Sequence, residues 1–214
     1  MRNSDTLSQL ESTCQQSPTL ERMSGLRERR HAETKAAIVD AAFTLFEKHG
    51  FSNTLMEQIA EHAGVSRSTL YRRYSNKEEI VLEVPQTWLD AWDAAIAEVH
   101  PEASLVDATT AGCFAVADTI DASPERVLAA YGALSESATL QLSGAASAFW
   151  LERIAALVEA RAESVDHFEA MVIAGACMGA IDVMMATWAS TGGKTLVRTE
   201  THRVIERISP ILDV

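Results

Sequence analysis

Residues 54–77 constrain the fold of this chain more than any other stretch, because several helix-start signals and a glycine turn follow one another there. S/T-x-x-E capping boxes begin at Thr54 and Ser75, and Ser66 lies between them as a typical N-cap residue. Gly64 can adopt the positive φ that ends a helix. The pattern predicts two helices joined by a tight turn, followed by a third. This is the helix-turn-helix arrangement, whose second helix enters the DNA major groove.

The second helix of the pair is predicted to present basic and hydroxyl side chains to DNA. Arginine can read guanine edges, and hydroxyl groups can reach phosphates or base edges. A lysine in the first turn of the third helix opposes the helix dipole, which a nearby phosphate would explain. The alternative is a helical hairpin with a solvated basic face. The candidate DNA-binding residues are Thr54, Ser66, Arg67, Ser68, Thr69, Tyr71, Arg72, Arg73 and Lys77.

The stretch resembles the DNA-binding domain of the tetracycline-repressor (TetR) family of transcriptional regulators. The resemblance covers about residues 32–82 and rests on IVDAAFTLFEKHGFSNT, IAEHAGVSRSTLYRRY and NKEEI. It implies an all-helical dimer with a DNA-reading N-terminal domain and a divergent C-terminal domain that usually binds an effector. Leu55 stands where family members often carry Ser or Thr, which puts one phosphate contact in question, and the first 30 residues exceed the usual short arm.

The charge of the chain is unevenly distributed. The net charge is −12, yet residues 1–77 hold 11 Lys and Arg against 9 Asp and Glu, whereas residues 78–214 hold 7 against 21. Phosphate binding depends more on the charge of the local surface patch than on the net charge of the whole chain. We therefore expect one end of the molecule to dock on DNA and the acidic part to be repelled.

Composition and spacing argue against several other classes. The three cysteines form no C-x-x-C pair, and no two histidines lie three or four residues apart. The N-terminus lacks the apolar core of a signal peptide. No nucleophile–base spacing or Gly-rich phosphate loop supports an enzyme. The sequence predicts a cytoplasmic, non-enzymatic protein without a metal or cofactor.

Helical periodicity predicts an all-α chain in three parts. Residues 1–30 are expected to be a flexible extension, 31–77 the helix-turn-helix DNA-binding domain, and 78–214 a helical effector-binding and dimerisation domain. The basic segment 26–31 is either an arm that follows DNA or the first turn of a helix over 32–49. Further helices are expected from Ser75 to Val99, with a kink or restart at Pro85, and at 104–120, 124–141, 145–164, 166–190 and 195–209.

The expected helix over 166–190 is almost wholly apolar between Ala170 and Ala189, long enough to be mistaken for a membrane helix. Its G-x-x-x-G spacing allows two helices to approach closely. We expect this helix to pack on a partner subunit, and the resemblance implies that the last two long helices form the dimer interface. The candidate interface residues are Gly175, Gly179, Val204, Ile205 and Ile208.

An effector pocket is expected among the apolar residues of the C-terminal part. Asp182 is unusual there, because a carboxylate in an apolar run needs a partner or a proton. It either bonds Arg, Ser or Thr of a neighbouring helix or subunit, or contacts a cationic or hydrogen-bonding ligand. Two tryptophans four residues apart are either core or part of a ligand cage. The candidate pocket residues are Trp88, Trp92, Cys113, Phe114, Tyr131, Trp150, Met178, Asp182 and Met185.

The sequence thus predicts a homodimeric DNA-binding regulator, a repressor released from its operator by a small-molecule effector. The alternative is a DNA-binding regulator whose C-terminal domain binds a protein partner rather than a metabolite. An exposed apolar face would favour the protein partner, and an enclosed cavity would favour the metabolite.

Overall fold

The computed structural model describes residues 18–142, 145–162 and 164–213, and every regular element within these ranges is a helix. The predicted all-α class is therefore confirmed. In chain order the helices are α1 (Pro18–His49), α2 (Met56–His62), α3 (Arg67–Tyr71), α4 (Lys77–Val81), α5 (Glu83–Glu98), α6 (Leu105–Asp121), α7 (Pro124–Glu136), α8 (Ala138–Leu142), α9 (Ala145–Arg161), α10 (His167–Ser190) and α11 (Val197–Leu212).

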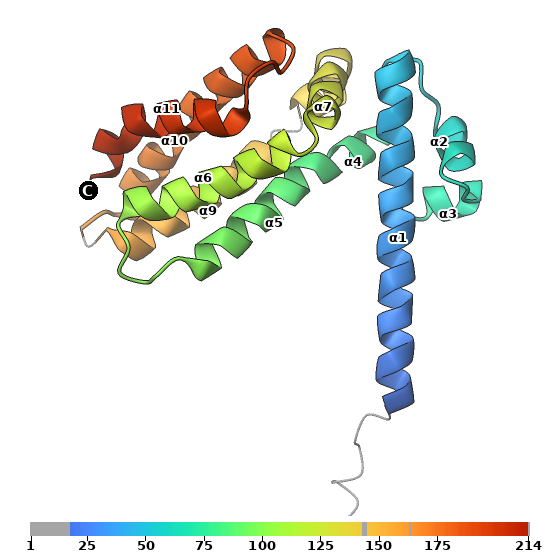
Figure 1. Cartoon of the computed structure of the whole chain (residues 1–214), viewed down its shortest axis with the longest axis horizontal. Helices are drawn as coiled ribbons and strands as arrows, with labels where there is room; N and C mark the ends of the chain where they lie inside the picture. Colours follow the sequence, from blue (N-terminus) through green and yellow to red (C-terminus); the bar gives the residue numbers. More distant parts are fainter. Residues whose placement is uncertain (1–17, 143–144, 163, 214) are drawn as a thin grey trace, which may run out of the picture.

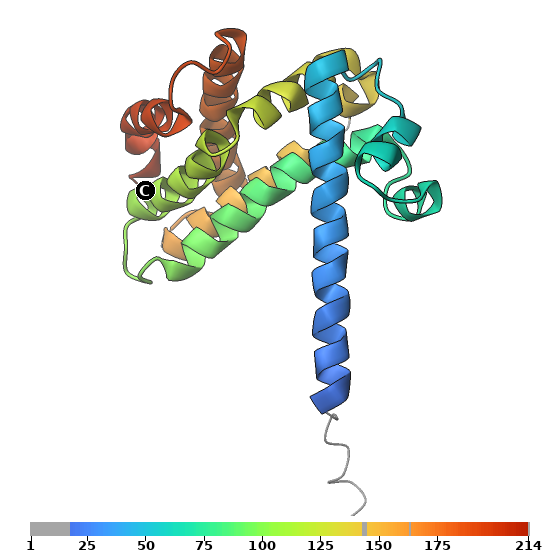
Figure 2. The same cartoon turned by 45° about the vertical axis from the view of Figure 1, so that its right-hand side comes forward.

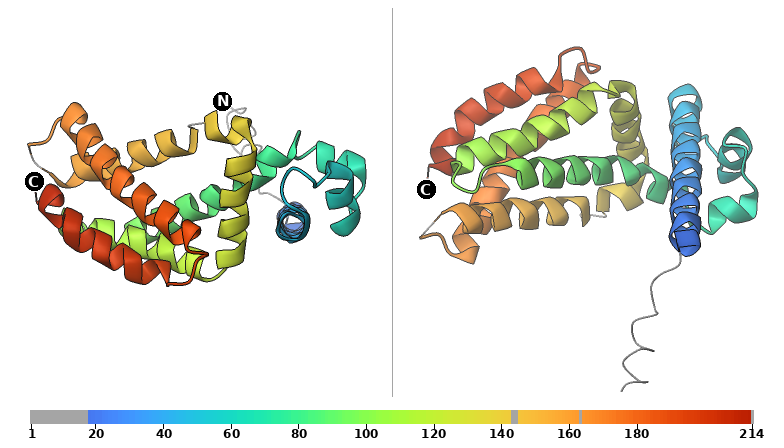
Figure 3. Two further views of the ribbon diagram at one scale, coloured as in Figure 1. Left: turned by 90° about the horizontal axis from the view of Figure 1, so that it is seen from above. Right: turned by 60° about the horizontal axis from the view of Figure 1, so that its bottom comes forward.

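Helix α1 is a long rod that separates two groups of helices. The short helices α2 and α3 lie on one side of it, and the helices from α5 onward lie on the other (Figure 1). The N-terminal half of α1 projects away from both groups (Figure 2). Helix α7 lies between α1 and the far C-terminal helices, as the view from above shows (Figure 3), and it packs on α1.

Two clusters of buried apolar side chains hold the fold together. The first joins Ile38 of α1 and Leu70 of α3 to Val127 of α7, so the core of the helix-turn-helix continues into the C-terminal helices. The second fills the C-terminal bundle, where Trp92 of α5 and Ala174 of α10 are buried. Continuous close packing means that a shift of one element is transmitted to its neighbours.

The first helix begins much earlier than its apolar pattern predicts. It starts at Pro18 rather than near residue 32, so the expectation of a flexible segment is wrong for residues 18–30, which are helical. The basic segment 26–31 accordingly lies inside α1. Proline suits the first helical position, and the Leu, Glu, Arg and Met residues that follow favour helix without needing a buried stripe. Residues 1–17, the rest of the expected extension, lie outside the described residues.

Two of the expected helices are broken in the structure. The predicted restart near Pro85 is confirmed: α4 ends at Val81 and α5 begins at Glu83. Proline has no N–H to donate to the carbonyl four residues back, which is that of Val81. The expected helix over 124–141 is instead divided at Ser137, whose backbone is extended and whose hydroxyl donates to Glu78 of α4.

Candidate functional site

The turn between α2 and α3 forms where the sequence predicts. Gly64 has a φ of +65°, and Val65 N–H closes the turn on the Ala60 carbonyl at 3.0 Å. The side chain of Ser66 caps α3 by accepting from Thr69 N–H at 3.1 Å. Leu70 is fully buried beneath the helix. Because α3 is a single short helix, burial of Leu70 leaves the opposite face of α3 in solvent.

The outer face of α3 carries basic and hydroxyl groups. Arg67, Ser68 and Arg72 are exposed, and no hydrogen bond or ion pair to either guanidinium occurs within the described part of the chain. The hydroxyl groups of Ser68 and Thr69 lie 2.9 and 2.8 Å from that of Ser66. Tyr71 is 46% exposed and donates to Glu57 at 3.2 Å. The two arginines are therefore free to contact an external anion.

Arg73 is placed differently from the other predicted DNA-binding arginines. Its side chain is half-buried, and one guanidinium nitrogen lies 3.2 Å from Nδ1 of His31 on α1. This contact joins the end of α3 to the basic segment 26–31. The structure therefore brings the last residue of that segment next to the residue that follows the C-cap of α3, which the sequence pattern did not indicate.

Thr54 does not cap α2 as the sequence pattern predicts. Its side chain is 1% exposed, and its hydroxyl donates to the Gly50 carbonyl at 2.9 Å. The N-cap of α2 is Leu55, whose N–H donates to the side chain of Gln58 at 2.9 Å. The predicted capping box is thus wrong by one residue, because the hydroxyl is needed by the turn that ends α1. A side chain so deeply buried is not on a DNA-facing surface.

Lys77 is also engaged by the protein itself. Its ammonium group donates to the carbonyls of Phe51, Ser52 and Thr54, and it lies 4.3 Å from the centre of the Phe51 ring. These interactions explain a cation in the first turn of α4 without any phosphate. The N-cap of α4 is Asn76 rather than the predicted residue before it.

The same loop after α1 is held from the C-terminal side by Glu136 at the end of α7. The Glu136 carboxylate accepts from Ser52 N–H at 2.8 Å. This backbone hydrogen bond lowers the pKa of the carboxyl group, and the charge of Lys77 acts in the same direction. Since α7 also packs on α1, the loop, α1 and α7 form one connected unit.

A cavity of about 340 Å³ lies among the helices from α4 to α11. Phe114 is the exception among the predicted pocket residues, since its ring lies 4.2 Å from the guanidinium of Arg198 outside the cavity. Neighbouring residues of a helix point about 100° apart, so only one of the pair at 113 and 114 can face inward. The predicted residues that line the cavity are Trp88, Trp92, Cys113, Tyr131, Trp150, Met178, Asp182 and Met185.

The sequence pattern missed the part of the cavity wall that lies nearest to α1. Leu82 and Pro85, at the break between α4 and α5, line the cavity, as does Leu140 of α8. Only the proline carries a signal that could have identified this wall, because it marks the helix break. The cavity therefore borders the segment that connects the C-terminal helices to the helix-turn-helix.

Asp182 is the only charged residue among the described residues that line this cavity. Partial burial raises the pKa of its carboxyl group, and burial together with Asp182 raises the pKa of Tyr131 to about 12. The expected structural bond to Arg, Ser or Thr is absent from the described part of the chain, where no hydrogen bond or ion pair to Asp182 occurs. Burial also raises the pKa of the Cys113 thiol to about 12, which keeps that thiol neutral.

The outer face of α10 is exposed and contains both predicted glycines. A Cβ atom added at Gly175 or Gly179 meets nothing within 4 Å, and Val183 is 69% exposed. Among the described helices, α10 alone is long and apolar enough to span a membrane by length and composition. Ile205 and Ile208, also predicted for the interface, are instead buried within the chain, because this face of α11 packs on neighbouring helices.

Comparisons with known proteins converge on one family. Residues 38–84 match the model described as bacterial regulatory proteins, tetR family. The regulator RutR of Escherichia coli K12 is 40% identical over 72 residues, which are 34% of this chain and 34% of RutR. The match thus spans about a third of the length of that relative.

The similarity to solved structures extends over most of the chain. The fatty acid degradation regulator FadR of Bacillus halodurans has a TM-score of 0.66 at 17% identity, covering 82% of this chain and 94% of that one. FadR of Bacillus subtilis, solved in complex with stearoyl-CoA, has a TM-score of 0.65 at 18% identity. The match covers 81% of this chain and 96% of that FadR chain. These likenesses establish a common fold.

Proposed function

This chain belongs to the TetR family of bacterial regulatory proteins, and from that premise we propose that it is a cytoplasmic, sequence-specific DNA-binding transcriptional regulator. More specifically, we propose a homodimeric repressor that a small-molecule effector releases from its operator. The observation that carries the proposal is the exposed face of α3, where the guanidinium groups of Arg67 and Arg72 make no hydrogen bond or ion pair within the described part of the chain. Membership in a family of regulators argues against the enzyme alternative.

The exposed face of α10 supports the dimer. Val172 and Val183 are 56% and 69% exposed on this helix, and the two glycines between them leave room for a second helix to approach. A second copy of the chain, packed on α10 and the adjoining side of α11, would cover this face. Two α3 helices related by a two-fold axis would then read half-sites about 34–36 Å apart in successive major grooves.

The cavity supports a small-molecule effector over a protein partner. Its volume of about 340 Å³ lies within the range of about 300–1,000 Å³ that is common for ligand pockets. Its wall includes Leu82 and Pro85, so a ligand would contact the segment that leads to the helix-turn-helix. An effector need only bind the non-DNA-binding conformation more tightly to shift the equilibrium. The mostly apolar wall suits a ligand with a long apolar chain, a feature also of the stearoyl-CoA in the complex of the B. subtilis relative.

Selection of binding sites from a random DNA library with the full chain tests the proposed DNA binding. We expect an enriched pseudo-palindrome whose half-sites are centred one helical turn apart. Arg67→Ala should weaken binding to the selected site by about 1–3 kcal/mol and relax the preference at one base position. Lys194→Ala, which removes an exposed cation from the loop between α10 and α11, is the matched control. Failure to enrich any sequence would refute the proposal.

A further inference from the structure

We propose that the ligand of the cavity is an apolar molecule that carries one positive charge, and that Asp182 binds this charge. The inference rests on the proposed role of the cavity as the effector site and specifies the chemical class of the effector. Asp182 lies at the edge of the cavity on α10, between the lining residues Met178 and Met185. A cation is the simplest partner for a lone carboxylate beside an apolar space.

The rest of the wall suits such a ligand. Three tryptophans and a tyrosine line the cavity, and Trp92 packs edge-on against Trp150 with 5.7 Å between ring centres. The faces of indole rings attract cations, and their large surfaces bind apolar groups. A quaternary ammonium group with an alkyl or aryl tail would match the carboxylate, the aromatic rings and the apolar volume together.

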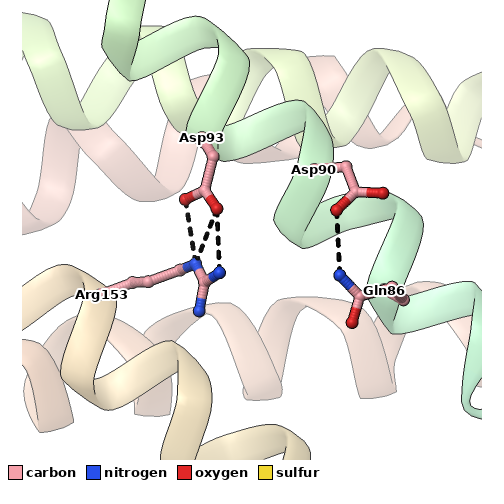
Figure 4. A network of polar contacts seen from close by, with 4 residues as sticks. All are labelled: Gln86, Asp90, Asp93 and Arg153. Atoms are coloured by element: carbon pink, nitrogen blue, oxygen red, sulfur yellow. Dashed lines mark hydrogen bonds and ion pairs between the residues drawn. The ribbon is translucent and has the colours of Figure 1, made fainter. Parts of the chain in front are cut away.

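Two acidic groups of α5, by contrast, are paired within the chain. On α5, the Asp93 carboxylate accepts from the Arg153 guanidinium at 2.9, 3.2 and 2.9 Å, and Asp90 accepts from Gln86 at 2.9 Å (Figure 4). Asp182 has no such partner in the described part of the chain. Asp182 is exposed to solvent and also lines the cavity, so a cation bound there would meet a carboxylate that has no competing partner in this part of the chain.

The charges of the cavity lining also disfavour anionic ligands. No Lys or Arg occurs among the described residues that line the cavity, so a bound carboxylate or phosphate would meet no counter-charge there. An anion would also experience repulsion from Asp182. The surrounding residues 78–214 hold 7 Lys and Arg against 21 Asp and Glu, which further favours a cation.

The test compares three probes that share one alkyl chain and differ in charge: decyltrimethylammonium, 1-decanol and decanoate. Binding to the full chain is measured by isothermal titration calorimetry below the micellar concentration, with the quenching of tryptophan fluorescence as a second readout. We expect decyltrimethylammonium to bind about tenfold more tightly than 1-decanol, and decanoate to bind most weakly. Asp182→Asn should abolish the advantage of the cation while leaving the affinity for 1-decanol unchanged.

The control variant is Asp90→Asn, which removes the same charge from the exposed side of α5. Non-specific attraction of a cation to an acidic protein would fall equally in both variants, whereas binding at the cavity falls only in Asp182→Asn. The proposal is overturned if 1-decanol or decanoate binds as tightly as the cation, or if the two variants behave alike.

A competing role for Asp182 is an ion pair with the partner subunit across α10. Sedimentation velocity of Asp182→Asn separates the two roles, since loss of the dimer with retained cation affinity would overturn the ligand proposal. The probe titrations need no operator. Failure of the charge preference therefore leaves the DNA-binding proposal standing, and failure to select an operator leaves the charge preference measurable.

Discussion

The ammonium group of Lys77 holds the loop that follows α1. It donates to three carbonyls of that loop, those of Phe51, Ser52 and Thr54. Charge-assisted hydrogen bonds of this kind contribute more to stability than neutral ones. Lys77→Met keeps the length of the side chain and removes the donors. We expect the free energy of unfolding to fall by about 1–2 kcal/mol, measured by urea denaturation.

Lys48→Met is the matched control, because Lys48 is an exposed cation in the last turn of α1. Its free energy of unfolding should change by no more than about 0.5 kcal/mol. Operator binding gives a second measurement: Lys77→Met should leave the salt dependence of the affinity unchanged. A salt slope reduced by about one unit at unchanged stability would instead return Lys77 to the phosphate-contacting role that its sequence position predicts.

Sequence patterns located the helix-turn-helix and the Ser66 cap of α3, but not the caps of α2 and α4. The pattern S/T-x-x-E occurs at both Thr54 and Ser75, yet each helix is capped one residue later. The reason is a competition between local partners: the Thr54 hydroxyl donates to the Gly50 carbonyl four residues earlier, and Asn76 caps α4 in place of Ser75. A local motif cannot reveal that a neighbouring carbonyl needs the same hydroxyl.

At the scale of elements, apolar periodicity predicted the long C-terminal helices well and the breaks only where proline marked them. The break at Pro85 was predicted. The break at Ser137, whose hydroxyl donates to Glu78 far away in sequence, is marked by no proline and was not predicted. Part of the cavity lining was predictable because large apolar residues of several helices had to face one interior. The position of Phe114 was not predictable, since the rotation of α6 decides that this half-buried ring packs on Arg198 rather than lining the cavity.

The break between α4 and α5 is the covalent connection between the helix-turn-helix and the C-terminal helices. We propose that Pro85 marks a joint there, because the missing N–H leaves the Val81 carbonyl without its helical donor. Pro85→Ala restores that donor and should allow α4 and α5 to merge into a straighter, stiffer helix. We expect the fold and dimer to persist while operator affinity, or its response to effector, changes.

Mobility-shift titrations with and without a cavity ligand check this prediction. Gln86→Ala serves as the control, since it alters the next residue of α5 without supplying a new backbone donor. The spacing of the two α3 helices depends on the direction of α5, so even a small change in helix bend should alter affinity. If Pro85→Ala matches the parent protein in both states, the joint lies elsewhere.

At the scale of the whole molecule, the arrangement separates three surfaces that a regulator of this kind needs. The exposed face of α3 lies on one side of α1, and α10 and α11 lie on the other, far from it (Figure 1). The cavity lies between them and borders the break at Leu82. A ligand can therefore affect the position of α3 without touching either DNA or the proposed dimer face.

The dimer proposal makes a prediction that separates interface effects from folding. Gly179 has open space where a Cβ would be, so Gly179→Leu should not strain the single chain. In a dimer packed through α10, the same leucine would enter a close helix contact, where overpacking costs about 1–3 kcal/mol. We therefore expect the dimer dissociation constant to rise by about fivefold to 150-fold in sedimentation equilibrium, with unchanged helical content. Gly25→Leu, a substitution at an equally open glycine on the projecting part of α1, should leave dimerisation unaffected. A Gly179→Leu dimer of undiminished affinity would place the interface away from this face of α10.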